Sequence, residues 1–211
     1  MRMCGCQFSA KPDHMRIIGG IAAGRILQVP KGLGVRPTPD LVKQALFNSL
    51  GPRILESRVL DLFSGSGALG LESLSRGAAY VLSIEKSIKH ARWIQGNVKE
   101  CRIPNDRHKM KVQDVFPALK QLIEQGTQFD LIMADPPFGE KNINKRSQSL
   151  SQRLLDVAEL PRILSPDGLF LMGHTKRDDV TITPWWECRK TMKHGDSMFE
   201  FLAPVSSKNP S

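Results

Sequence analysis

Short apolar runs alternate along the chain with segments in which apolar residues recur every three or four positions. A short apolar run bounded by glycine, proline or polar residues is typical of a buried parallel strand, and the longer spacing is typical of an amphipathic helix. The runs predict strands over residues 59–63, 80–84, 109–113, 129–134 and 168–172. The periodic segments predict helices over residues 40–50, 68–76, from 87 onward, 117–125 and 148–163.

Strand and helix follow one another four times, which is typical of right-handed βαβ units and of a parallel sheet covered on both faces. Two further runs, residues 186–193 and 198–204, flank the polar segment 194–197 and predict a closing antiparallel hairpin. The pattern therefore predicts an α/β fold with a doubly wound, mostly parallel, seven-stranded sheet of the Rossmann-like type.

The N-terminal part of the chain has a different character. Residues 16–18 and 25–29 are β-prone and flank a glycine-rich centre, which predicts a small hairpin, and the Gly and Pro content of residues 31–39 predicts a loop. Asp40 is the expected N-cap of the helix that follows. We expect a disordered extension over 1–14, a basic hairpin and loop over 15–39, and the main domain over 40–211.

Basic residues outnumber acidic ones by 30 to 21, and the excess is concentrated near the N-terminus. Residues 1–50 hold seven Lys and Arg against two Asp, and a second cluster contains Lys141, Lys145 and Arg146. Concentrated positive charge of this kind is the electrostatic footprint of a protein that binds phosphate backbones. The charge therefore favours a nucleic acid as the partner.

Other features exclude several classes of protein. At 211 residues and 40% hydrophobic content the chain suits one globular domain, and no apolar run approaches the ~20 residues of a membrane helix. Without a secretion signal the expected location is the cytoplasm, where the four cysteines stay reduced. Cys4 and Cys6 lack the second ligand pair of a zinc site, so we expect no metal.

A glycine motif, Gly65-x-Gly67-x-x-Gly70, lies between the first predicted strand and its helix. This is the position that a nucleotide-binding loop requires. Glu85 follows Gly65 by 20 residues and is placed to accept hydrogen bonds from ribose hydroxyls, and Asp114 at the end of the third strand could accept from an adenine amino group. These residues predict a nucleoside-containing ligand, either a nicotinamide cofactor or S-adenosylmethionine.

The segment Asp135-Pro136-Pro137-Phe138 distinguishes between these two candidate ligands. Two prolines directly after a buried strand end the sheet ladder and give a rigid loop at its active edge. The Asp135 carboxylate and the Pro136 carbonyl could accept the two N–H groups of an exocyclic base amine, and Phe138 offers a face on which the base can stack. The segment therefore favours methyl transfer to a base amine.

Several motifs together resemble the bacterial small-subunit (16S) ribosomal-RNA guanine-N2 methyltransferases. They are Arg16-Ile-Ile-Gly-Gly20 with Gly24-Arg25, Arg36-Pro-Thr38, Ala45-Leu-Phe-Asn48, Asp61-Leu-Phe-Ser-Gly-Ser-Gly-Ala-Leu-Gly-Leu-Glu72 and Asp135-Pro-Pro-Phe138. The resemblance runs from about Met15 to the final hairpin, and it departs at Phe138, where the family usually has Tyr.

The resemblance implies a class I methyltransferase fold and a role for each matching residue. S-adenosylmethionine would be bound by Asp61, Ser64, Gly65, Gly67, Glu85 and Asp114. Asp135, Pro136, Pro137 and Phe138 would hold the guanine amine. RNA would be bound by Arg16 and Arg25 of the hairpin, and the positive charge adds Arg36, Lys141, Lys145 and Arg146 to that set. The expected partner is ribosomal RNA, within an assembling small subunit, and the expected state is a monomer.

Three alternatives stay open at this point. An amine methyltransferase acting on DNA or on another RNA shares the Asp-Pro-Pro-aromatic segment, although only about 40 residues precede the main domain as a recognition element. A nicotinamide-dependent oxidoreductase would explain the glycine motif and leave the two prolines unexplained. A catalytically inactive RNA-binding protein with the same fold is the third alternative, and the presence of Asp135 argues against it.

Overall fold

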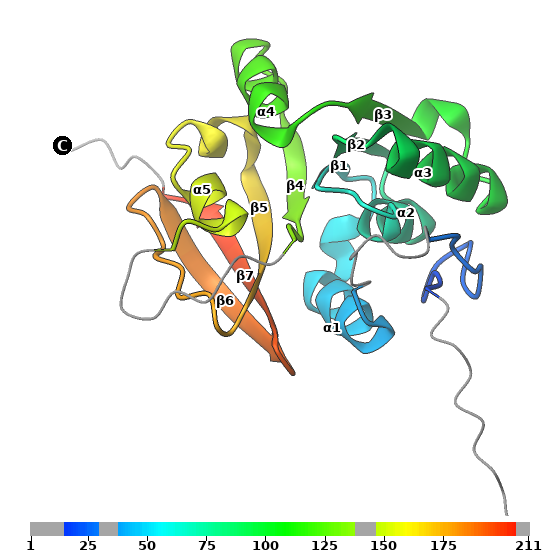
Figure 1. Cartoon of the computed structure of the whole chain (residues 1–211), viewed down its shortest axis with the longest axis horizontal. Coiled ribbons are helices and arrows are strands. Elements are labelled where there is room, and N and C mark those ends of the chain that lie inside the picture. The colour runs from blue at the N-terminus through cyan, green and yellow to red at the C-terminus, as the bar shows by residue number, and fades with distance from the viewer. Residues whose placement is uncertain (1–14, 30–37, 138–146, 206–211) are drawn as a thin grey trace, which may run out of the picture.

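The computed structural model describes residues 15–29, 38–137 and 147–205, and these form one central sheet with helices on both of its faces (Figure 1). The predicted extension 1–14, the cysteines Cys4 and Cys6, and the expected site residues Arg36, Phe138, Lys141, Lys145 and Arg146 lie outside the described residues.

The sheet has seven strands in the order β3-β2-β1-β4-β5-β7-β6. The first five strands are parallel, and β7 pairs antiparallel with both β5 and β6. The predicted doubly wound, mostly parallel sheet is confirmed. Its strands are β1 (Arg58–Leu62), β2 (Tyr80–Glu85), β3 (His108–Val112), β4 (Phe129–Ala134), β5 (Leu164–Thr175), β6 (Trp186–His194) and β7 (Ser197–Pro204).

The helices divide between the two faces because alternate residues of each strand point to opposite sides. Val59 of β1 packs into a core with α1, α2 and α3, and Leu60 packs into a second core with α4 and α5. The α-helices are α1 (Asp40–Leu50), α2 (Ala68–Ser75), α3 (Ile88–Glu100), α4 (Val115–Glu124) and α5 (Leu150–Leu155), and the 3-10 helices are η1 (Gly51–Ile54), η2 (Asn105–Arg107) and η3 (Leu160–Ile163). None of the described helices is long and apolar enough to cross a membrane.

The N-terminal hairpin, residues 15–29, is closed by one antiparallel bridge between Arg16 and Ile26 rather than by two regular strands. It has no core of its own, and Met15, Ile17 and Leu27 are buried in the core of the main domain. Its backbone is held by the carboxylate of Glu72 on α2, which accepts hydrogen bonds from the N–H groups of Ile18 and Gly19 at 2.8 Å each.

Several predicted bounds are wrong in detail. The strand expected over 168–172 is longer than predicted and runs from Leu164 to Thr175. The helix expected over 148–163 stops at Leu155 and is followed by the separate 3-10 helix η3. Pro161 excludes one continuous helix through 163, because proline in a helix interior removes a hydrogen bond and clashes with the carbonyl four residues earlier, and it lies instead in the first turn of η3. Asp40 is the first residue of α1 and not its N-cap, which is Pro39. The Asp40 carboxylate instead accepts a hydrogen bond from Arg16 at 2.8 Å.

Candidate active site

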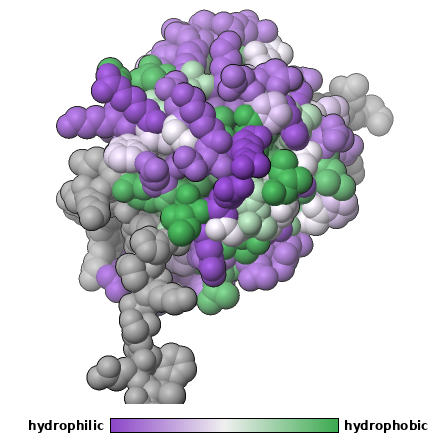
Figure 2. Space-filling view, turned by 90° about the vertical axis from the view of Figure 1, so that its right-hand side faces the viewer, coloured by the Kyte–Doolittle hydropathy of each residue, from purple (hydrophilic) through white to green (hydrophobic). Residues whose placement is uncertain are grey.

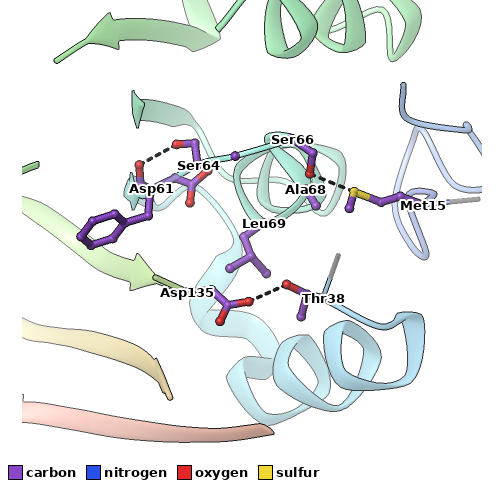
Figure 3. Close-up of a pocket in the computed structure, with 10 residues that line it drawn as sticks. Met15, Thr38, Asp61, Ser64, Ser66, Ala68, Leu69 and Asp135 are labelled. Carbon is purple, nitrogen blue, oxygen red and sulfur yellow. Dashed lines mark hydrogen bonds between the residues drawn. The ribbon is translucent and has the colours of Figure 1, made fainter. Parts of the chain in front are cut away.

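A pocket opens at the carboxyl ends of β1 and β4, which are neighbours in the sheet (Figure 3). From β1 the chain continues to β2 on one side, and from β4 to β5 on the other, so this is the point at which the strand order reverses. Ligands of open α/β sheets bind at such switch points. The pocket is lined by Met15, Thr38, Asp61, Phe63, Ser64, Gly65, Ser66, Ala68, Leu69 and Asp135.

The glycine motif forms the loop between β1 and α2, as the sequence predicts. Gly65 and Gly67 both have positive φ, and the N–H of Gly67 donates to the carbonyl of Ser64 at 2.6 Å. Gly70 lies in the first turn of α2, where a Cβ would come within 2.9 Å of Asp61 Oδ2. The third glycine therefore lets the helix pack directly against the carboxyl group of β1.

Glu85 lies at the end of β2 and holds this loop in place. Its Oε2 accepts from the N–H of Gly65 at 2.9 Å, and its Oε1 accepts from the N–H of Ser87 at 2.8 Å. A carboxylate oxygen can accept more than one hydrogen bond, so both atoms retain acceptor capacity for a ribose. The predicted ribose contact stays a prediction.

Asp61 carries an unusual carboxyl group. The side chain is 2% exposed, and among the described residues its Oδ2 has no hydrogen-bond partner. Burial raises the pKa of Asp61 to about 7. Hydrogen bonding by the Ser64 side chain and the Gly70 backbone opposes this rise, and the negative charges of Glu85 and Asp135 add to it. A buried acceptor without a donor costs free energy unless a ligand supplies one. The pocket therefore favours a ligand that is a cation or a hydrogen-bond donor.

Asp135 follows β4 directly and is joined to a residue 97 positions away. Its Oδ2 accepts a hydrogen bond from Thr38 Oγ1 at 2.6 Å (Figure 3). On the β5 side a Cβ at Gly173 would come within 2.7 Å of Asp135 Oδ1, so only glycine leaves room for this carboxylate. Burial raises the pKa of Asp135, and the hydrogen bond from Thr38 opposes that rise. The chain continues into Pro136, which is buried, and Pro137, which is exposed.

The structure brings part of the predicted site together. Asp61, Ser64, Gly65 and Asp135 line one pocket, and Gly67 lies in the same loop. Glu85 is not part of the lining and reaches the site only through its hydrogen bond to Gly65. Asp114 does not line the pocket. It is exposed at the end of β3, where it is the N-cap of α4 and accepts from the N–H of Phe116.

The hairpin arginines lie on the surface. Arg16 forms an ion pair with Asp40 at 2.8 Å, and Arg25 is exposed. Their predicted contact with RNA stays a prediction.

The sequence did not predict that the hairpin contributes a side chain to the lining of the pocket. The side chain of Met15 lines it, and Ser66 Oγ lies 2.9 Å from the Met15 sulfur (Figure 3). No spacing rule points to this contact. The position of Met15 at the start of a β-prone run was the only available signal.

A family model described as conserved hypothetical protein 95 matches residues 15–203, which is nearly the whole chain. The chain belongs to this family. A relative, the ribosomal RNA small subunit methyltransferase D of Haemophilus influenzae, is 36% identical to it over 171 residues, which are 81% of this chain and 83% of the relative. The predicted family is thereby confirmed, and methyl transfer is the activity of the chain.

Solved structures of other proteins have the same fold as this chain. A structure described as a candidate methyltransferase from Escherichia coli has a TM-score of 0.72 at 29% identity and covers 90% of this chain and 98% of its own. An RNA methyltransferase from Salinibacter ruber, in complex with S-adenosyl-L-homocysteine, has a TM-score of 0.60 at 18% identity and covers 83% and 97%. At that identity the second likeness shows the fold alone, which is the predicted class I methyltransferase fold.

Proposed function

We propose that the protein transfers a methyl group from S-adenosylmethionine to the exocyclic N2 amine of a guanine in small-subunit ribosomal RNA. One observation carries the proposal above the others. The carboxyl groups of Asp61 and Asp135 line a single pocket at neighbouring strand ends, and Asp135 is followed by two prolines. The first acid suits a cationic cofactor, and the second suits an amine.

The residues present fit S-adenosylmethionine. The Asp61 carboxyl offers a buried oxygen that no described residue satisfies, and the cofactor carries positive charge on its sulfonium and its ammonium group. The loop containing Gly65 and Gly67 lets backbone N–H groups approach a ligand, and Glu85 beside it has acceptor capacity for ribose hydroxyls. Once bound, the cofactor supplies an electrophilic methyl group, so the work of the protein is alignment and exclusion of water.

Asp135 and Pro136 provide the groups that an aromatic amine needs. The lone pair of such an amine is delocalised into the ring, which makes its nitrogen a poor nucleophile. The Asp135 carboxylate accepts a hydrogen bond from one N–H of the amine, and the Pro136 carbonyl accepts one from the other. These two bonds orient the nitrogen toward the methyl group. After transfer the nitrogen loses a proton, and the Asp135 carboxylate is placed to accept it. Thr38 holds that carboxylate in one orientation through its 2.6 Å hydrogen bond.

Ribosomal RNA is the substrate that the charge and the family membership support. The chain carries a net charge of +9, and its relative in Haemophilus influenzae is named for the small-subunit ribosomal RNA. A ribosomal target can be recognised through its shape and its phosphates by a small protein. We place the protein in the cytoplasm, acting as a monomer on an assembling small subunit.

The test is transfer of tritium from labelled S-adenosylmethionine to small-subunit particles and to naked 16S RNA from cells that lack this protein. Digestion and mass spectrometry should identify N2-methylguanosine as the product. Asp135→Asn should reduce kcat at least about a hundredfold and leave the Kd for the cofactor unchanged, because the removed charge acts on the amine. Asp179→Asn, an exposed surface change, serves as the matched control.

Three results would contradict the proposal. Methylation of adenine or cytosine would reject guanine as the target. Full activity of Asp135→Asn would reject the catalytic assignment, and binding of labelled NAD in place of the methyl donor would reject the activity itself.

A further inference from the structure

Helix α3 carries a basic face that the proposed reaction does not use. Lys89, Arg92 and Lys99 lie at spacings of three and seven residues, which places them on one side of a helix. All three are exposed, and Glu100 is the one acidic residue within the helix. Within the described parts of the chain, no carboxylate forms an ion pair with any of them.

The same face of α3 also carries an aromatic side chain, Trp93, and a glycine, Gly96. Trp93 is 38% exposed, although large aromatic side chains are mostly buried. Gly96 is a neighbour of both Arg92 and Trp93 on the helix surface, and a Cβ there would meet no atom of the described residues within 4 Å. Glycine weakens a helix interior, and no described neighbour requires it here. The effect is to leave the guanidinium and the indole ring uncovered.

The hairpin extends this face toward the pocket. The side chain of Asn97 on α3 accepts from the N–H of Gln28 at 2.8 Å and donates to its carbonyl at 3.0 Å. Arg25 lies three residues before Gln28 in the hairpin and is exposed, and its charge acts on the thiol of Cys101 at this same C-terminal end of α3. Met15 at the start of the hairpin lines the pocket. The side of the molecule that carries α3 in Figure 1 faces the viewer in Figure 2, where hydrophilic side chains predominate around patches of hydrophobic ones.

We infer that Lys89, Arg92, Trp93 and Lys99 of α3 form a contact surface for the RNA substrate beyond the pocket and the hairpin arginines, which we call the α3 surface. The inference rests on the proposed function. The basic groups span about 15 Å along the helix, which is long enough to contact more than one phosphate of a strand. Trp93 offers a face for an unpaired base or a ribose, since aromatic stacking and basic side chains together are typical of single-stranded RNA contacts.

The inference predicts a change in the salt dependence of binding. Each phosphate contact that is lost reduces the slope of log K against log salt by about 0.7 to 0.9. Arg92→Gln/Lys99→Gln should therefore reduce the slope by about 1.5 and weaken binding of a 16S RNA transcript about tenfold near physiological salt. The matched control is Lys120→Gln/Arg162→Gln, which removes one exposed Lys and one exposed Arg from the opposite face of the sheet.

Trp93 gives a second and independent readout. Trp93→Ala should weaken RNA binding about tenfold with an unchanged salt slope, because stacking releases no counterions, and Trp93→Phe should restore most of the affinity. Cofactor affinity and the circular dichroism spectrum should stay unchanged in all variants, which would show that the fold is intact.

The outcomes separate this inference from the function on which it rests. If the natural protein methylates the RNA and Arg92→Gln/Lys99→Gln binds with the natural affinity and slope, the α3 surface is wrong and the function stands. If the variant loses affinity for assembled particles and keeps its affinity for naked RNA, the surface contacts a ribosomal protein and the inference is again wrong. A natural protein with neither activity on the RNA nor affinity for it overturns both.

Discussion

At the scale of single residues, the carboxyl group of Asp61 makes cofactor binding depend on pH. Its pKa of about 7 means that the carboxyl group is largely protonated at pH 5.5 and largely ionised at pH 7.5. The ionised form attracts a cationic ligand, so the Kd for S-adenosylmethionine should fall about tenfold over this range. Isothermal titration calorimetry would measure the change, together with the proton released on binding.

Asp61→Asn is the control for this prediction, since it keeps the size of the side chain and removes its titration. The variant should bind more weakly than the natural protein at pH 7.5, with a Kd that hardly changes with pH. The same pH dependence in both proteins would show that another group is responsible.

Thr38 is expected to act on the reaction through Asp135. Thr38→Val keeps the shape and removes the hydrogen bond to Asp135 Oδ2, a bond to a charged group worth about 1.5–3 kcal/mol. The kcat should fall at least about tenfold, and the acid limb of the pH–rate profile should move to higher pH, because the bond opposes the raised pKa of Asp135. Thr38→Ser should restore both properties. An unchanged profile in Thr38→Val would reject this role.

The residue pattern alone could predict a site residue only where the residue's position at the end of a strand determines its place in the fold. Glu85 ends β2 and Asp135 follows β4, so the strand pattern alone places them at one edge of the sheet, whereas Asp61 within β1 was assigned to the cofactor only through the family resemblance. Thr38 and Met15 approach the same pocket from segments outside the sheet. Thr38 was expected there only through the family resemblance, which includes Arg36-Pro-Thr38, and no local pattern pointed to Met15. Asp114 also ends a strand, but β3 is two strands away from β1, and the sequence does not give that order.

At the scale of elements, the hairpin is attached to the main domain through a buried charge. The side chain of Glu72 is fully buried on α2, and besides the two hairpin N–H groups it accepts from Arg76 Nε at 2.6 Å. Glu72→Gln presents an amide N–H₂ group to at least one of these donors. The free energy of unfolding should fall by about 3 kcal/mol, as for the loss of one partner in a buried ion pair. Urea denaturation would measure this loss.

Hydrogen exchange would localise the effect of Glu72→Gln. The amides of Ile18 and Gly19 should lose more protection than those of β4, because they donate to this carboxylate. Glu124→Gln, at the exposed end of α4, should leave both measurements unchanged. Equal loss of protection across the sheet would show that Glu72 supports the core and not the hairpin.

Element boundaries were predicted well where apolar periodicity and a capping residue coincide. Ser87 is the N-cap of α3 and accepts from the N–H of His90, and the predicted start agrees. Asp40 looks equally suited to a cap, yet the hairpin supplies Arg16, which competes for its carboxylate. That competition depends on tertiary structure and leaves no trace in the local sequence.

At the scale of the whole molecule, the alternation of strands and helices was sufficient to predict the doubly wound sheet. A parallel pair needs a crossover, and right-handed crossovers leave few arrangements for five strands. The exact order is a matter of tertiary packing, in which residues far apart in the chain, such as Phe129 of β4 and Phe170 of β5, share one core. The final hairpin then covers one edge, and its exposed outer strand β6 carries Glu187, Arg189, Lys190 and Lys193, as charged edge strands do to avoid pairing with other chains.

The free energy of unfolding should change least with pH between about pH 4.5 and 6.5. Burial alone would lower the pKa of His174, but Glu200 raises it above 6.5, so the stability from this pair is present below 6.5 and is lost as pH rises through the folded value. Burial would raise the pKa of Glu200, but its hydrogen bonds lower it below 4.5, so its contribution is lost as pH falls through the folded value. Between these limits Asp61 and His108 offset each other, since burial raises the first pKa from 3.8 to about 7 and lowers the second from 6.5 to about 4. The raised pKa of Asp135 leaves a shallow fall of stability with rising pH in this range. Urea denaturation from pH 3.5 to 8.5 should show that the free energy of unfolding falls on both the acid and the alkaline side. The alkaline fall should be smaller in His174→Gln. The control His194→Gln, at an exposed position, should behave as the natural protein. An alkaline fall of the same size in His174→Gln would remove the pair from this account.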